Sequence, residues 1–420
     1  MRRLIATGLM AASAGLTVAA QQGAPRGTVG APAAGAWVTA WGTSQQALGD
    51  ATISDGTVRL VARVTIPGET VRIRLDNGYG AEPVQVARAT IAYRVQGPLV
   101  AAGSLRPLTF DQRPEVTIPP GGVVWSDPVS MPVRAQQDLA VSLYIPGRDV
   151  RPSQHTNALV TSYRTGNGVG DATADESRTR FTETMTAMWR LKSVEVQSST
   201  AGGAIIAFGD SITDGTCATL DAHDRWVNIL SVRLGLEHEA ARARGDNRSR
   251  LKAVVNEGIG GNTVTANVQP PPDSRPALER FDRDVLSHHG VTDVILFVGT
   301  NDLRREASVR QVTDGLATLV KRVKAAGARV YGVTMIPRHN AAPNGTNTGW
   351  TAEKTARRRE VNAWIRSKGG FDQVLDFDEI VRDPAQPDLI LPPFNCGDGI
   401  HPSPAGYYAI GTAIPLAPFR

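Results

Sequence analysis

The sequence contains few cysteines and few aromatic residues, and it lacks the short motifs of several large enzyme classes. Only two of its 420 residues are Cys, and Phe, Trp and Tyr together make up 5%. It has no phosphate-binding glycine loop followed by Lys, no dinucleotide fingerprint and no His-Glu-x-x-His. We therefore predict no nucleotide cofactor and no catalytic metal, and two cysteines are too few for a structural zinc site.

Concentrated charge of one sign is also missing. The 45 Lys and Arg residues and the 40 Asp and Glu residues are scattered along the chain, and no basic stripe alternates with aromatic residues. This distribution argues against nucleic acid as a partner. Beyond the N-terminus no segment is apolar enough to cross a bilayer, so we predict no integral membrane part there.

The N-terminus has the pattern of an export signal. Arg2 and Arg3 precede an apolar segment over residues 4–20 that is rich in Ala and Gly and ends in small residues. This order predicts a signal peptide over residues 1–20, cleaved near Ala20, and hence a secreted protein, extracellular or periplasmic. The alternative is an uncleaved membrane anchor, for which the segment holds too many small residues.

Export affects the interpretation of the two cysteines. In an oxidising compartment an even pair more often forms a disulfide than two free thiols, so we expect a bridge between Cys217 and Cys396. Cys217 follows Ser211 by six residues, and Cys396 precedes His401 by five. The bridge would join the two ends of the C-terminal half, whereas two buried free thiols are the alternative.

The front half of the chain has the pattern of antiparallel strands. Residues 21–35 are small and rich in Gly and Pro, which predicts a flexible lead-in. Apolar and polar residues then alternate in short runs bounded by turn signals, as over 58–66 and 71–75, and no useful helical period occurs. We predict an all-β sandwich or jelly-roll accessory domain over residues 36–198, with strands that have one buried and one wet face.

Near residue 199 the pattern changes to strands that alternate with helices. This alternation predicts an α/β domain over residues 199–420, with a parallel sheet covered on both faces in three α/β/α layers. Strands are expected at 204–208, 251–256, 293–298, 329–335 and 374–377, and helices at 225–234, 277–286, 309–325, 351–367 and from about 404.

A serine stands at the end of the first of these strands. The apolar run 204–208 ends abruptly in Gly209-Asp210-Ser211. Open α/β sheets bind ligands at the carboxyl ends of their strands, so the Ser211 hydroxyl lies where a nucleophile would act. Acyl transfer through serine also needs a base, a group that orients the base, and donors for the oxyanion.

The last loop of the chain offers the base and its orienting group. Asp398 and His401 are three residues apart, so a single turn can bring the carboxylate to imidazole Nδ1 and leave Nε2 facing a serine. Ser403 and Pro404 have the residue types of a helix N-cap and first helical residue, which would fix this turn. Alone, such a pair often arises by chance, and we assign no role to another pair, His288-His289.

Two further strand ends offer oxyanion donors. Gly260 and Gly261 lie in the stretch 256–262, where glycine lets a backbone N–H approach a ligand closely. Asn301, in Gly-Thr-Asn-Asp, has a side-chain amide that could donate as well. Each has an ordinary alternative, a simple turn for the glycines and a helix N-cap for Asn301.

Taken in this order, the four segments closely resemble the SGNH (GDSL-type) hydrolases over about residues 204–411. The resemblance implies a serine esterase with Ser211 as nucleophile, His401 as general base and acid, and Asp398 as the group that orients His401. The β-rich half is similar to the all-β domain that precedes the hydrolase domain in a bacterial secreted subgroup. The rival α/β-hydrolase elbow is excluded, because Thr213 occupies the position of its last glycine.

The resemblance also implies an oxyanion hole formed by the Ser211 N–H, the Gly261 N–H and the Asn301 side chain. The family commonly has Ser-Gly where this chain has Gly260-Gly261, so Gly260 is the alternative donor. Gly261 is preferred because it precedes Asn262.

We therefore expect a secreted esterase that hydrolyses short-chain carboxylic esters, with acetyl groups on polysaccharides as the leading substrate class. The low aromatic content and the lack of a long apolar lid argue against a lipase acting at an interface. The polar stretch 337–350 could line a sugar subsite or be a plain surface loop. The alternatives are a lysophospholipase or other short-chain lipid esterase, and a non-catalytic cell-surface carbohydrate-binding protein, against which the complete catalytic set argues.

Overall fold

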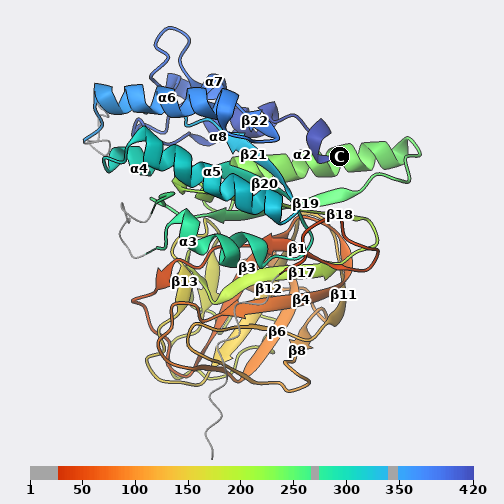
Figure 1. The fold of residues 1–420 in the computed structure, drawn as a ribbon. Helices are drawn as coiled ribbons and strands as arrows, with labels where there is room; N and C mark the ends of the chain where they lie inside the picture. The colour runs from red at the N-terminus through yellow and green to blue at the C-terminus, as the bar shows by residue number, and fades with distance from the viewer. Residues whose placement is uncertain (1–26, 266–273, 339–348) are drawn as a thin grey trace, which may run out of the picture.

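The computed structural model describes residues 27–265, 274–338 and 349–420. Figure 1 shows a β-rich part, in the lower half of the view, packed against an α/β part above it. The predicted signal peptide over residues 1–20 lies outside the described residues. Within the described ranges, no helix is both long and apolar enough to cross a membrane.

The N-terminal part is all β, as predicted. Two larger sheets have the orders β1-β17-β4-β10, with β11 also on β4, and β15-β14-β3-β12-β6-β7, with β8 also on β6. The strands of this part are β1 (Trp37–Gly42), β2 (Ala47–Leu48), β3 (Gly56–Val64), β4 (Gly68–Asp76), β5 (Val84–Val86), β6 (Arg88–Gln96), β7 (Leu99–Val100), β8 (Arg106–Leu108), β9 (Val116–Ile118), β10 (Val123–Trp125), β11 (Val129–Val133), β12 (Gln137–Ile145), β13 (Ser153–His155), β14 (Ser162–Arg164), β15 (Glu183–Met185), β16 (Met188–Trp189) and β17 (Leu191–Gln197).

The second face of β3 is largely buried, and so is Arg74 on β4, so the prediction of a wet face is wrong at these places. Arg59 on β3 is buried and donates hydrogen bonds to Ser142 Oγ and to the Asp175 carbonyl. Arg74 on β4 is buried and donates to the carbonyl and Oγ of Ser287, in the α/β part. A charged side chain can be buried where acceptors meet it, so an alternating pattern does not by itself mean solvent exposure.

The C-terminal part contains a parallel sheet of five strands in the order β19-β18-β20-β21-β22. Its strands are β18 (Ala201–Gly209), β19 (Leu251–Gly258), β20 (Val291–Phe297), β21 (Arg329–Val333) and β22 (Gln373–Leu375). In chain order this is 2-1-3-4-5, and the connections reverse direction between β18 and β20, where such sheets place their ligands. The predicted strands are confirmed, with shifted ends.

The helices of this part fall into two groups. In one group α2 contacts α8 and α8 contacts α7, and in the other α5 contacts α3, α4 and α6, as expected for layers on two sides of a sheet. The helices are α1 (Ser211–Asp214), α2 (Trp226–Ala243), α3 (Ala277–Phe281), the π-helix η2 (Asp282–Leu286), α4 (Thr300–Arg304), α5 (Val309–Ala325), α6 (Ala352–Lys368), α7 (Phe377–Val381), the 3-10 helix η3 (Pro392–Phe394), α8 (Pro404–Ala413) and the 3-10 helix η4 (Ala417–Phe419).

The two parts pack closely together. Strand β1 lies against β19 and β18, and buried apolar side chains of both parts belong to one contiguous core cluster. Part of the predicted lead-in is also fixed rather than flexible, because Gly27 donates to the Leu286 carbonyl and Gly30 to the Val291 carbonyl. Strand β17 ends at Gln197 and β18 begins at Ala201, so only a short connection joins the parts.

Candidate active site

Ser211, His401 and Asp398 form a hydrogen-bonded chain at the carboxyl end of the parallel sheet. Ser211 Oγ lies 2.8 Å from His401 Nε2, and His401 Nδ1 lies 2.5 Å from Asp398 Oδ2. A carboxylate only accepts, so Nδ1 carries the proton and Nε2 is left to accept the hydroxyl proton of Ser211. This is the arrangement by which an imidazole can deprotonate a serine hydroxyl.

Asp398 is held in its ionised form. Its Oδ1 accepts hydrogen bonds from the backbone N–H groups of Ile400 and His401, each at 2.8 Å. Burial alone would raise the pKa of Asp398, but the hydrogen bond and charge of His401, together with these N–H groups, lower it to about 2. The carboxylate is therefore fixed by its own turn before it orients the imidazole.

The turn that carries His401 is anchored as the sequence predicts. Helix α8 begins at Pro404, and its N-cap Ser403 accepts a hydrogen bond at Oγ from the Gly406 N–H. On the other side, the Cys396 N–H donates to the His401 carbonyl. The imidazole is thus fixed between a helix start and a local backbone contact.

Ser211 is the first residue of the short helix α1. Asp210 is its N-cap and accepts from the Ile212 N–H at 3.1 Å, while the other carboxyl oxygen of Asp210 is buried with no hydrogen-bond partner among the described residues. Burial raises the pKa of Asp210 to about 7. The N–H of Ser211 itself makes no backbone hydrogen bond within the described ranges, so it is available to a ligand.

Residues 259–262, which we call the oxyanion loop after the role predicted for Gly261, follow β19. The Gly260 N–H donates to Asp214 Oδ2 at 2.9 Å and is therefore already used. Gly261 has a φ of 72°, its carbonyl accepts from Arg305, and its N–H has no partner among the described residues. Of the two candidate glycines, Gly261 is the one whose N–H is free to meet a substrate.

Asn301 lies within α4, after β20, and is buried. Its Nδ2 donates one hydrogen bond to the Asn262 carbonyl at 3.1 Å, which places it beside the oxyanion loop, and Nδ2 makes no second hydrogen bond among the described residues. The N-cap of α4 is Gly299, whose φ of 131° suits glycine, so the alternative that Asn301 caps the helix is wrong.

Asp302, next to Asn301, fixes the chain at residues 264–265, just after the oxyanion loop. Its carboxylate accepts hydrogen bonds from the N–H groups of Val264 and Thr265 and from the Thr265 hydroxyl. Burial raises the pKa of Asp302 to about 6, even though these donors oppose the shift.

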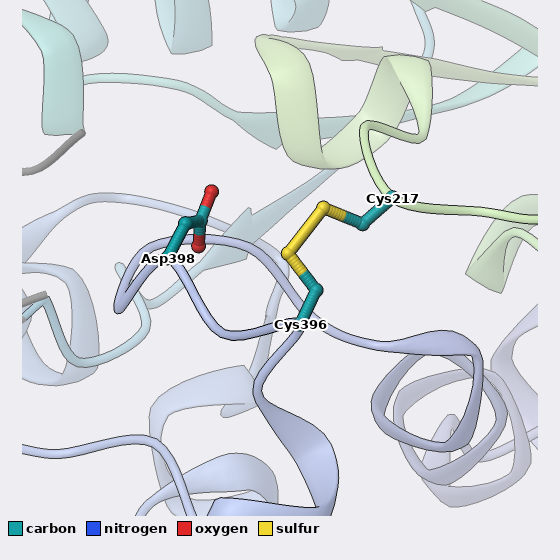
Figure 2. Close-up of side chains that lie close together, drawn as sticks. All are labelled: Cys217, Cys396 and Asp398. Carbon is teal, nitrogen blue, oxygen red and sulfur yellow. A yellow bond between two sulfur atoms is a disulfide. The ribbon is translucent and has the colours of Figure 1, made fainter. Parts of the chain in front are cut away.

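The predicted disulfide between Cys217 and Cys396 is confirmed (Figure 2). The sulfur atoms of these residues and a carboxylate oxygen of Asp398 lie within 4.8 Å of one another, a grouping that could suggest a metal site. Because both sulfur atoms are used in the disulfide, neither is a thiolate that could bind an ion. The bridge instead connects the chain just after α1 to the loop that carries the imidazole.

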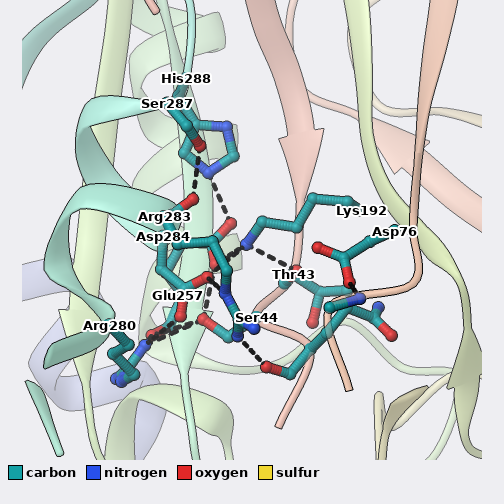
Figure 3. Close-up of polar contacts among 12 residues, drawn as sticks. Thr43, Ser44, Asp76, Lys192, Glu257, Arg280, Arg283, Asp284, Ser287 and His288 are labelled. Carbon is teal, nitrogen blue, oxygen red and sulfur yellow. Dashed lines mark hydrogen bonds and ion pairs between the residues drawn. The ribbon is translucent and has the colours of Figure 1, made fainter. Parts of the chain in front are cut away.

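A buried polar network lies behind the oxyanion loop and joins the two parts of the chain (Figure 3). Lys192 Nζ, from β17, lies 2.6 Å from Glu257 Oε2 and 2.9 Å from Asp284 Oδ1, and all three side chains are fully buried. Arg280 donates to the Gly209 carbonyl at 2.8 Å and to Asn262 Oδ1 at 3.0 Å. The network therefore contacts both the strand end before Ser211 and the oxyanion loop.

Several of these residues could not be found from sequence patterns. His155, on β13, contacts Asp214, three residues after Ser211, and Lys192 was one of several charges in an alternating strand. Their partners are distant in the sequence, so no spacing signals them. His288, which we gave no role, is buried beside Glu257, with Nε2 2.7 Å from Oε1.

The stretch 337–350 is described only at its ends, since residues 339–348 lie outside the described ranges. Trp350 is buried, its Nε1 donates to Thr355 Oγ1, and the Arg338 guanidinium lies over its ring at 5.0 Å. The one aromatic ring of the stretch is therefore packed inside the protein rather than presented to a sugar.

Residues 207–409 match the model of the GDSL-like Lipase/Acylhydrolase family. The matched part is just under half of the chain, and it is similar to this acylhydrolase family. No curated protein matches the chain.

The solved structures that align with about half of the chain include two bacterial proteins. A carbohydrate acetylesterase family member from Sinorhizobium meliloti is 17% identical, covering 51% of this chain and 96% of that one, with a TM-score of 0.39. A GDSL-like lipase from Bacteroides thetaiotaomicron is 18% identical, covering 51% of this chain and 86% of that one, with a TM-score of 0.34.

Proposed function

We propose that this protein is a serine esterase that hydrolyses short-chain carboxylic esters through an acyl-enzyme. The observation that carries the proposal is the chain of contacts from Ser211 Oγ to His401 Nε2 at 2.8 Å and from His401 Nδ1 to Asp398 at 2.5 Å. The match of residues 207–409 to an acylhydrolase family supports the same reaction class.

The proposed reaction begins when His401 Nε2 takes the proton of Ser211 as Oγ attacks the ester carbonyl carbon. The tetrahedral intermediate collapses, His401 gives the proton to the departing alcohol, and the acyl group stays on Oγ. Water then attacks this acyl group, again losing its proton to His401. The carboxylic acid leaves, and the proton returns to Ser211.

The oxyanion would be held by the N–H of Ser211, the N–H of Gly261 and the side-chain amide of Asn301. Three observations support this choice: the first two N–H groups have no partner among the described residues, the Gly260 N–H is used by Asp214, and the Asn301 amide has a second N–H unused. Donors fixed before the substrate binds stabilise the charge as it develops, and each is worth about a hundredfold in turnover.

We propose acetyl and other short acyl groups on polysaccharides as the substrate class. A cavity of about 480 Å³ has a mixed lining that includes the polar side chains of Arg338, Thr355, Arg359 and Asp388. Arg338 also donates to Thr300 Oγ1 at 3.3 Å, and Thr300 is next to Asn301 in the sequence. Charged and hydroxyl side chains of this kind can hydrogen-bond to a sugar.

We also propose that the protein is secreted after cleavage near Ala20. The disulfide supports this proposal, because such bridges persist in oxidising compartments. Mass spectrometry of the protein from the culture medium or periplasm of its host would test it, with Gln21 expected as the first residue.

The reaction is tested with p-nitrophenyl esters of increasing chain length and with acetate release from acetylated xylan. We expect turnover to be highest for acetyl or butyryl esters and to disappear in Ser211→Ala. Activity that persists in this variant would refute the assignment, and a preference for long acyl chains or lysophospholipid would refute the substrate class.

Chemical labelling distinguishes the esterase from a non-catalytic carbohydrate-binding protein. A fluorophosphonate probe should modify Ser211 in the native protein and should fail to react with Ser211→Ala or His401→Ala. An unlabelled Ser211 in folded protein would favour the binding protein over the esterase.

A further inference from the structure

The β-rich part contributes a histidine directly behind the candidate site. His155 is buried, with Nδ1 2.9 Å from the Ser44 carbonyl oxygen and Nε2 3.0 Å from Asp214 Oδ1 and 3.2 Å from the Asn157 carbonyl oxygen. Carbonyl and carboxylate oxygens accept hydrogen bonds and cannot donate them. Both ring nitrogens therefore face acceptors, an arrangement that favours the imidazolium form of His155.

Asp214 connects this imidazolium to the oxyanion loop. It is the last residue of α1, three residues after Ser211, and its two carboxylate oxygens face opposite partners. Oδ1 accepts from His155, whereas Oδ2 accepts from the Gly260 N–H at 2.9 Å. The residue after Gly260 is Gly261, whose N–H is the proposed oxyanion donor.

The charges around this contact support an ion pair. Burial alone would lower the pKa of His155, but the charge of Asp214 and its hydrogen bond, helped by the Ser44 carbonyl, raise it above the usual value for histidine. The other charged group facing this pair is Arg225, whose guanidinium donates to the backbone carbonyl of Asp214 at 3.2 Å.

We propose that His155 is a positioning residue for the oxyanion hole, acting through Asp214 and Gly260. The proposal rests on the proposed esterase function. The imidazolium fixes the position of the Asp214 carboxylate, the carboxylate holds the Gly260 N–H, and the peptide between Gly260 and Gly261 is thereby oriented so that the next N–H meets the developing oxyanion. In this proposal the β-rich part, through His155, helps to position an oxyanion donor of the α/β part.

The kinetic test compares His155→Leu, which removes both donors, with His155→Gln, which keeps one amide donor for Asp214. His238→Leu is the matched control. His238 contacts Ser249 Oγ near the amino end of β19, whereas Ser211 follows the carboxyl end of β18. Rates for p-nitrophenyl acetate are expressed per active site, counted by complete fluorophosphonate labelling, and melting temperatures are recorded for every variant.

We expect kcat to fall at least about tenfold in His155→Leu with KM little changed, because a displaced oxyanion donor weakens binding of the transition state alone. His155→Gln should recover much of the rate, and His238→Leu should match the wild type. A wild-type kcat in His155→Leu, while Ser211→Ala is inactive, would overturn this inference and leave the esterase assignment intact. Wild-type activity in Ser211→Ala would overturn both.

A second measurement does not depend on turnover. In Ser211→Ala protein, ¹⁵N NMR of the imidazoles should show both ring nitrogens of His155 protonated at neutral pH, and Asp214→Asn should lower the pH at which the ring loses its charge. A neutral His155 ring at neutral pH would overturn the inference.

Discussion

Removal of the Cys217–Cys396 bridge should lower the free energy of unfolding. The expected loss depends on the length of the loop that the bridge closes. The cysteines are 179 residues apart, so the bridge closes a long loop in the unfolded chain. The loop-entropy relation gives about 5 kcal/mol for a loop of this length, and native disulfides typically contribute about 2–5 kcal/mol. We therefore expect the double variant Cys217→Ser/Cys396→Ser to lose about 2–5 kcal/mol of unfolding free energy.

Activity should fall much less than stability. The His401 turn keeps its own hydrogen bonds, from the N–H groups of Ile400 and His401 to Asp398 and from Gly406 to Ser403, when the bridge is absent. The folded fraction of the double variant should therefore retain most of its esterase rate at 25 °C.

The assay is urea unfolding followed by fluorescence, with esterase rates measured at low urea. A reductant should shift the wild-type midpoint toward that of the double variant and leave the double variant unchanged, which is the control for side effects of the substitutions. A loss below about 1 kcal/mol would refute the loop-entropy reasoning, since it would fall well short of the expected range.

Asn301→Ala should lower kcat about a hundredfold with KM little changed, and an unaltered kcat for p-nitrophenyl acetate would remove Asn301 from the oxyanion hole. Asp210→Asn keeps an oxygen to cap α1 but removes a carboxyl group whose pKa burial raises to about 7. Because the raised pKa reduces wild-type stability as pH rises from about 4 to about 7, the melting-temperature advantage of this variant should grow over that range, and a constant difference would contradict it. Lys192→Met should cost about 1.5–3 kcal/mol in urea unfolding, because it removes a charged donor from two buried carboxylates that keep His288, Arg280 and Arg283 as partners, whereas the exposed Lys324→Met control should cost under about 1 kcal/mol; similar losses would contradict the buried network.

The catalytic geometry could be predicted because each part of it is local in the sequence. Ser211, Gly261 and Asn301 follow three strands that are neighbours in a parallel sheet, so their convergence needs only the strand order. Asp398 and His401 share one turn, whose contacts lie within a few residues. Short-range patterns of this kind are visible before any fold is known.

Helix ends were harder to predict. The expected helix over 225–234 stops before Gly235, a residue that destabilises a helix interior by about 1 kcal/mol, yet α2 continues to Ala243. Helix α2 contacts α8 and β19 along its length, and this packing outweighs the local preference. The start of α4 was also hard to predict, because its N-cap is Gly299 and not Asn301.

The contribution of the β-rich part could not be predicted, because it is made by single residues without a period. Arg74 and Lys192 look like the wet face of alternating strands, and His155 stands in a loop-like stretch. Each is buried only because a partner from the other part of the chain meets it, Ser287 for Arg74, Glu257 for Lys192 and Asp214 for His155. Pairing across a distance of many residues leaves no trace in local spacing.

These contacts also bear on whether the β-rich part is an accessory. Lys192 of the β-rich part pairs with Glu257 and Asp284, which also contact His288, Arg280 and Arg283 of the α/β part, and His155 of the β-rich part pairs with Asp214. Loss of one charged hydrogen bond costs about 1.5–3 kcal/mol, a sizeable share of the stability of a typical domain. Because Asp214 also accepts from the Gly260 N–H, the β-rich part contacts a residue that holds the loop 259–262 as well as adding to stability.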